Sequence, residues 1–186
     1  MYNLQLSHWR RARIWIDDLP SDYVFEFLGH IETRFGSNTT SPSVGRVAIE
    51  ILMPHGGKSD YGLLGGEFVP NECNELVVTA YHSGPDYGSL VDSLAAPLDV
   101  VRVGLPLEYS QAVVSGIGMV GSDAVLPAGQ LRVFLATHGT FNSSIFFFRR
   151  LGKALFKIMT APVLPLDEEE MARFLDEVLK SISSEG

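Results

Sequence analysis

Residues 130–159 read QLRVFLATHGTFNSSIFFFRRLGKALFKIM, and the pattern inside this stretch decides the fold class that the sequence predicts. Residues 130–136 alternate apolar and polar side chains, which indicates a strand with one buried face. Residues 143–159 form a long segment with apolar side chains at helical spacing, and Asn142 and Ser143 before it are typical helix caps. The stretch therefore predicts a strand, a polar turn and a capped helix.

Further strands and helices are predicted on both sides of this unit. Alternation of apolar residues predicts strands at residues 11–17, 46–53, 67–69, 76–81 and 98–103. Apolar residues at helical spacing predict helices at residues 24–35, 105–117 and 167–186. The Gly-rich segment 54–66 and the segment 83–89 are expected to be turns or mobile loops.

This order of elements predicts the fold class and the domain organisation. Interleaved strands and helices of this kind are typical of an α+β protein, in which helices pack on one face of a mixed β-sheet. A chain of 186 residues is long enough for one sizeable domain. We expect residues 1–166 to form a single α+β domain and residues 167–186 to form an acidic C-terminal helix that packs on it.

The composition excludes several classes of protein. Cys73 is the only cysteine, so no internal disulfide can form, and no Cys/His cluster has the spacing of a zinc site. The start of the chain lacks the apolar segment of a secretory signal, and no apolar run approaches the ~18 residues of a membrane span. The sequence therefore predicts a cytoplasmic protein with no cofactor, no metal and no membrane partner.

The charge distribution favours a protein partner over free nucleic acid. The net charge is −8, and residues 167–186 contain seven of the 22 acidic residues but two of the 14 basic residues. Binding to phosphates needs clustered Lys and Arg, which an acidic chain of this kind does not supply in excess. The acidic balance leaves room for a basic protein partner.

Two motifs bear a partial resemblance to enzyme chemistry. The sequence GGKS at residues 56–59 is like the end of a phosphate-binding loop, but the first glycine of that motif would fall on Leu52. His138 with Ser143 or Ser144 is like a base and its nucleophile, but five residues of loop do not ensure hydrogen-bond reach between them. A hairpin loop and a helix cap are the favoured interpretations, and no catalytic residue is predicted.

The helix at 143–159 also carries the candidate binding residues. Its basic side chains recur at i, i+4 and i+8, which suits a docking face for an acidic surface or RNA, a solvated helix face, or a contact with the acidic last helix. Three consecutive phenylalanines at 146–148 cannot all face one core, so one of them is expected to reach a second layer or an interface. The candidate binding residues are His138, Asn142, Phe147, Arg149, Arg150, Lys153 and Lys157.

Residues 104–117, GLPLEYSQAVVSGI, resemble the helix of domain IV of elongation factor G. The matching positions are Leu105, Pro106, Tyr109, Ala112, Val113, Gly116 and Ile117. Downstream, that family has a strand, a polar loop with a glycine, and a helix opened by Ser-Ser, and residues 130–136, Gly139, Ser143, Ser144 and Ala154 take those places. The resemblance extends loosely over residues 45–160 and implies the β-α-β fold shared with several ribosome-associated domains.

The same resemblance does not imply translocation activity. The chain has no GTP-binding motif, and the histidine that the family places between the glycine and the Ser-Ser pair is missing, because His138 precedes Gly139. The sequence thus favours a non-catalytic cytoplasmic protein-binding module, such as an immunity or antitoxin-type inhibitor of a basic partner. The alternatives are a ribosome- or RNA-associated module and an enzyme of unknown type, and the sequence indicates no oligomeric state.

Overall fold

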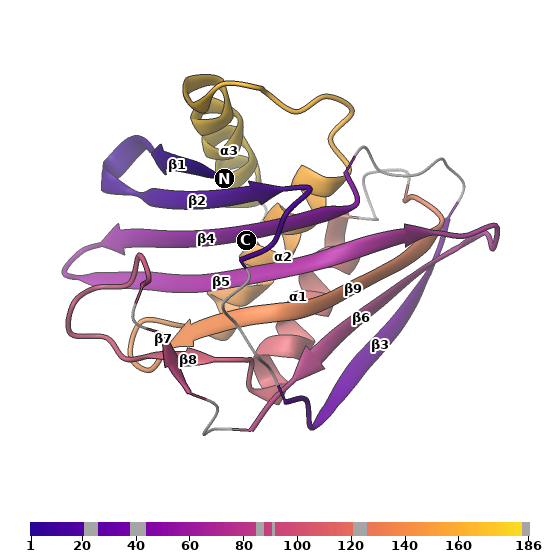
Figure 1. The fold of residues 1–186 in the computed structure, drawn as a ribbon, viewed down its shortest axis with the longest axis horizontal. Helices are drawn as coiled ribbons and strands as arrows, with labels where there is room; N and C mark the ends of the chain where they lie inside the picture. Colours follow the sequence, from indigo (N-terminus) through magenta and orange to yellow (C-terminus); the bar gives the residue numbers. More distant parts are fainter. Residues whose placement is uncertain (21–25, 38–43, 85–87, 91, 121–125, 184–186) are drawn as a thin grey trace.

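The computed structural model describes residues 1–20, 26–37, 44–84, 88–90, 92–120 and 126–183 (Figure 1). Within these ranges, nine strands form one mixed sheet with the order β1-β2-β4-β5-β9-β6-β3, and β7 and β8 continue from β9 on a side branch. The strands are β1 (Tyr2–Gln5), β2 (Arg11–Ile16), β3 (Gly29–Gly36), β4 (Arg46–His55), β5 (Lys58–Pro70), β6 (Glu75–His82), β7 (Ser89–Leu90), β8 (Val101–Val103) and β9 (Gly129–Gly139). The α-helices are α1 (Leu107–Val120), α2 (Ile145–Met159) and α3 (Glu168–Ser183), and a short 3-10 helix spans Ser7–Trp9. The predicted α+β class is confirmed.

The helices cover one face of the sheet. Figure 1 shows α1 and α2 behind the strands, with α3 beside β1 at the upper edge. The α1 and α2 backbones approach closely at Gly116 and Gly152, where a Cβ would lie 2.1 Å from the Arg149 carbonyl oxygen and 2.7 Å from that of Val113. A single large apolar core fills the space between helices and sheet, because the strands alternate and each helix has one apolar face.

Strand β9 sits in the centre of the sheet and has neighbours of both directions. It pairs antiparallel with β5 and β8 and parallel with β6. Since β6 and β9 are parallel, the chain between them must cross over the sheet, and α1 lies in this crossover. This β-α-β unit brings the amino-terminal end of α2 to the carboxyl end of β9.

The predicted helix at residues 24–35 is wrong where the structure describes it. Residues 29–36 form strand β3, which pairs antiparallel with β6 and alternates half-buried and exposed side chains. Ile31 and Phe35 are four apart, so they satisfy the spacing of a helix face as well as the period of a strand. Pairing with β6 favours the strand over the helix. Residues 24 and 25 of the predicted helix lie outside the described residues.

The predicted turn or loop at residues 54–66 is confirmed only at Gly56 and Gly57, and the rest of this segment forms strand. A hairpin turns at Gly56 and Gly57, whose φ angles of 53° and 81° suit a tight two-residue turn, and β5 then runs straight through the remaining glycines. These later glycines are required by packing, because a Cβ on Gly62 would lie 2.9 Å from the Phe147 ring. The predicted loop at 83–89 falls partly on residues 85–87, outside the described residues.

The other predicted elements are confirmed with shifted ends. Strands at 11–17, 46–53, 76–81, 98–103 and 130–136 correspond to β2, β4, β6, β8 and β9, and the strand at 67–69 is the end of β5. The helices at 105–117, 143–159 and 167–186 correspond to α1, α2 and α3. Helix α3 packs against β1 and α2 through its predicted apolar face, which buries Met171 and Leu175.

Candidate functional site

The turn between β9 and α2 is held by serine hydroxyl groups. The backbone N–H of Gly139 donates to Ser143 Oγ at 2.8 Å, and the same hydroxyl donates to the Tyr61 carbonyl oxygen at 2.6 Å. Ser144 caps α2, since its Oγ accepts a hydrogen bond from the Phe147 N–H at 3.1 Å. The predicted cap at Asn142 or Ser143 is therefore one or two residues too early.

His138 is fixed by the backbone rather than by a serine. Its Nδ1–H donates to the Gly104 carbonyl oxygen at 2.8 Å, and its ring meets the Tyr109 ring edge-on at 5.7 Å. Burial disfavours the charged imidazolium and lowers the pKa of His138. Both hydrogen-bonding roles of the Ser143 hydroxyl are taken by backbone groups, so these contacts do not assemble a nucleophile and its base.

The three consecutive phenylalanines divide between core and surface. Phe147 and Phe148 are buried, and Phe148 stacks on Tyr109 with ring centroids 4.8 Å apart. Phe146 is 69% exposed, and the guanidinium carbon of Arg149 lies 5.5 Å from the centroid of its ring. The phenylalanine that cannot face the core is therefore Phe146, and the candidate Phe147 is not accessible to a partner.

The basic residues of α2 do not form one exposed stripe. Lys153 is buried at 4% exposure, and Lys157 donates through Nζ to the Ser181 hydroxyl of α3 at 3.0 Å. Arg149 and Arg150 are half-buried. A docking face built from all four side chains is thus contradicted, because neighbouring parts of the molecule cover Lys153.

Exposed apolar side chains lie along the β9–α2 turn, the first turn of α2 and the segment before β8. Phe141 is 78% exposed, and its N–H donates to Asp99 Oδ1 at 3.0 Å. The Thr140 N–H donates to the Val100 carbonyl oxygen at 3.0 Å, so the two segments lie side by side. We call this region the Phe141–Phe146 surface, and its exposed apolar residues are Leu98, Val100, Phe141, Ile145 and Phe146.

The opposite face of the sheet holds a buried carboxylate that the sequence analysis did not single out. Glu50 is 1% exposed, and its Oε1 accepts hydrogen bonds from Tyr61 Oη at 2.9 Å and from the Leu94 N–H at 2.8 Å. Tyr61 Oη also lies 3.0 Å from Thr137 Oγ1. Burial raises the pKa of Glu50. The one signal in the sequence is an acid in the middle of a strand whose neighbours are all apolar or small.

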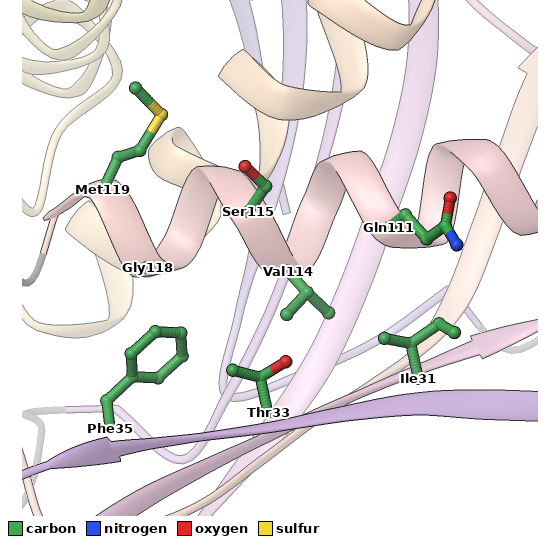
Figure 2. Close-up of a pocket in the computed structure, with 8 residues that line it drawn as sticks. All are labelled: Ile31, Thr33, Phe35, Gln111, Val114, Ser115, Gly118 and Met119. Carbon is green, nitrogen blue, oxygen red and sulfur yellow. The ribbon is translucent and has the colours of Figure 1, made fainter.

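A groove runs between the edge strand β3 and helix α1, with a volume of about 490 Å³. Figure 2 shows Ile31, Thr33 and Phe35 pointing from β3 toward the helix. The helix side consists of Gln111, Val114, Ser115, Gly118 and Met119. The lining is mostly apolar, which suits a protein segment better than a charged ligand.

Comparisons with known proteins give no relative. No family model matches the chain, and no curated protein and no solved structure matches it significantly. The resemblance to domain IV of elongation factor G therefore stays a prediction. In the described part of the chain, no group of three His, Cys, Asp or Glu residues could hold a metal ion. None of the described helices combines the length and apolar character that crossing a bilayer requires.

Proposed function

We propose that the protein is a non-catalytic protein-binding module whose recognition site is the Phe141–Phe146 surface. The observation that supports this proposal is the exposure of two phenylalanines within six residues, at 78% and 69%. Exposed apolar side chains on neighbouring segments are typical of an interaction site, and aromatic residues and arginine dominate the binding energy of protein interfaces. Arg149, stacked over Phe146, adds such an arginine to the same surface.

The charge of the chain favours a basic partner. The net charge is −8, and two acidic residues lie beside the Phe141–Phe146 surface. Asp99 accepts a hydrogen bond from the Phe141 N–H, and Asp60 is hydrogen-bonded to Ser144 at the start of α2. Acidic residues at the rim of an apolar centre steer a basic protein toward it and leave the aromatic groups to be buried. An immunity or antitoxin-type inhibitor in the cytoplasm is the form of this function that we favour.

The test uses a double variant at the surface and a matched control. A photo-crosslinking capture from the native host identifies the partner, which is then purified and titrated against the wild type, Phe141→Ser/Phe146→Ser and Val163→Ser/Leu166→Ser. The control residues are equally exposed but lie between α2 and α3. We expect the first variant to raise the dissociation constant about 30-fold or more, because the loss of one hot-spot side chain alone costs about 2 kcal/mol.

The outcome separates this proposal from the alternatives. The control should bind like the wild type, because its side chains lie outside the Phe141–Phe146 surface. Equal affinity of all three proteins for the purified partner would place recognition elsewhere on the molecule. Recovery of ribosomes with salt-sensitive binding, and of no single basic protein, would favour the ribosome-associated alternative.

A further inference from the structure

Strand β3 forms one edge of the sheet, and its outer side has no neighbouring strand among the described residues. It pairs with β6 on its inner side over eight residues, Gly29–Gly36. The opposite edge is different, because β1 has four residues and α3 packs against it. A long edge strand with an apolar groove beside it is a template for a further strand, and natural proteins usually cover or block such an edge.

The ladder with β6 shows which backbone groups point outward. The Ser37 N–H donates to the Asn74 carbonyl oxygen at 3.0 Å, in line with the register that pairs Gly36 with Glu75. Hydrogen-bonded pairs recur at every second residue of an antiparallel ladder, so the odd-numbered residues of β3 direct their N–H and C=O groups to β6. The N–H and C=O groups of His30, Glu32 and Arg34 therefore point to the outer edge.

We propose that β3 pairs antiparallel with β3 of a second copy of this chain, about a two-fold axis at Thr33. In this register Glu32 lies opposite Arg34 of the second copy, and Arg34 lies opposite its Glu32. Both residues belong to the set with outward backbone groups, so the same pairs also exchange backbone hydrogen bonds. Two opposite-charge pairs result from one strand, because a two-fold axis repeats every contact.

Charge complementarity selects this register over its neighbours. A shift that places the axis at Glu32 sets the two Glu32 side chains against each other, and a shift to Arg34 does the same with two arginines. Like charges directly opposite on paired strands are destabilising. The Arg34 side chain is 63% exposed, so a second copy can reach it. It lies 3.1 Å from Glu32 and 3.4 Å from Glu75 of its own chain, and pairing between copies would exchange these exposed ion pairs for intermolecular ones.

The groove side of β3 matches the same arrangement. With the axis at Thr33, Ile31 lies beside Phe35 of the second copy, and the two Thr33 side chains meet, all on the helix side of the sheet. Aromatic–aliphatic and Thr–Thr cross-strand pairs both favour association. In this dimer the groove of Figure 2 lies between the two α1 helices. The apolar side chains of Ile31 and Phe35 in the groove then become buried from solvent.

The test is a charge swap followed by sedimentation equilibrium of the purified full chain. We expect the wild type to be a monomer–dimer mixture that shifts with concentration. Glu32→Arg and Arg34→Glu should each weaken the dimer about tenfold or more, because each turns two attractive pairs into repulsive ones. Glu169→Arg on α3 is the matched control, since Glu169 is exposed and α3 lies at the opposite edge of the sheet, and it should dimerise like the wild type.

Mixing the two single variants gives the sharper result. An equimolar mixture of Glu32→Arg and Arg34→Glu should form a heterodimer, because each Arg then faces a Glu, and the double variant should regain the homodimer. Circular dichroism checks that every variant is folded. A wild type that stays monomeric up to about 1 mM, or a dimer that both single reversals leave intact, would overturn the proposal. The measurement needs no other protein, so its result is independent of the Phe141–Phe146 surface.

Discussion

Arg13 and Glu50 lie directly opposite each other on strands β2 and β4, with Arg13 Nη1 3.4 Å from Glu50 Oε2. The same arginine reaches Asp92 through Nη2 at 3.0 Å, and Glu50 accepts the Leu94 N–H. The pair therefore ties the segment around residues 92–94 to the sheet face opposite α1 and α2. Its burial makes Glu50 the group whose replacement tests this tether most directly.

The change in the free energy of unfolding on replacing Glu50 should depend strongly on the new side chain. Glu50→Gln keeps an acceptor for Tyr61 and Leu94, and Arg13 stays paired with Asp92, so we expect the free energy of unfolding at neutral pH to fall by less than about 1 kcal/mol. Glu50→Ala leaves the Leu94 N–H without its acceptor and should lose about 2–3 kcal/mol. Urea unfolding of the three proteins measures both values, and equal losses would contradict the tether.

Glu50 should also contribute to the pH dependence of the free energy of unfolding. Burial raises its pKa above the ordinary 4.5, so the folded state binds more protons than the unfolded state between 4.5 and the raised pKa. The free energy of unfolding should therefore fall as pH rises through this window. Subtracting the pH profile of Glu50→Gln isolates the contribution, and a difference that is flat from pH 4 to 8 would argue against it.

His138 should have the opposite effect, so that the free energy of unfolding rises as pH rises. Burial lowers its pKa below 6.5, so the unfolded state binds more protons between the lowered pKa and 6.5. The stabilising effect of the neutral ring is complete above 6.5 and is lost as pH falls through that window. His138→Gln retains a donor for the Gly104 carbonyl oxygen and should be less sensitive to acid, which thermal unfolding between pH 5 and 8 can measure.

Helix packing should fail at a single glycine. A Cβ on Gly116 would lie 2.1 Å from the Arg149 carbonyl oxygen, so Gly116→Ala must push α1 and α2 apart. We expect a net loss of about 2 kcal/mol or more, even though alanine favours the helix by about 1 kcal/mol. Ser115→Ala, at an exposed position of the same helix, is the control and should change stability by less than about 0.5 kcal/mol. Similar urea midpoints for the two variants would refute the close approach.

Local patterns predicted most of the elements because side-chain periodicity survives in the folded chain. The alternation in 130–136 and the helical spacing in 143–159 both correspond to buried faces of β9 and α2. Periodicity does not distinguish helix from strand at residues 29–36, because Ile31 and Phe35 fit the period of both. The glycines of residues 54–66 led to a different error, because they predicted a loop. Gly62 and Gly65 lie inside strand β5, where neighbouring side chains leave no room for a Cβ.

The binding residues were harder to predict than the fold. Spacing on a helix identifies a face, but it does not say what packs on that face. Lys153 therefore appeared equivalent to Arg149 in the sequence, yet it is buried. Phe146, Phe147 and Phe148 are three identical residues in a row, and the packing of α2 on the rest of the molecule leaves only Phe146 exposed.

The sequence by itself determined the α+β class and the β9–α2 unit, and it placed the helix cap within two residues of Ser144, because each depends on residues close together in the chain. Only the tertiary structure decided that β3 is an edge strand, that Glu50 is buried against Arg13, and that Phe141 and Phe146 face outward. These features depend on pairing and packing between segments far apart in sequence. The free energy of such a contact depends on residues from distant parts of the chain, so a local sequence pattern does not predict it.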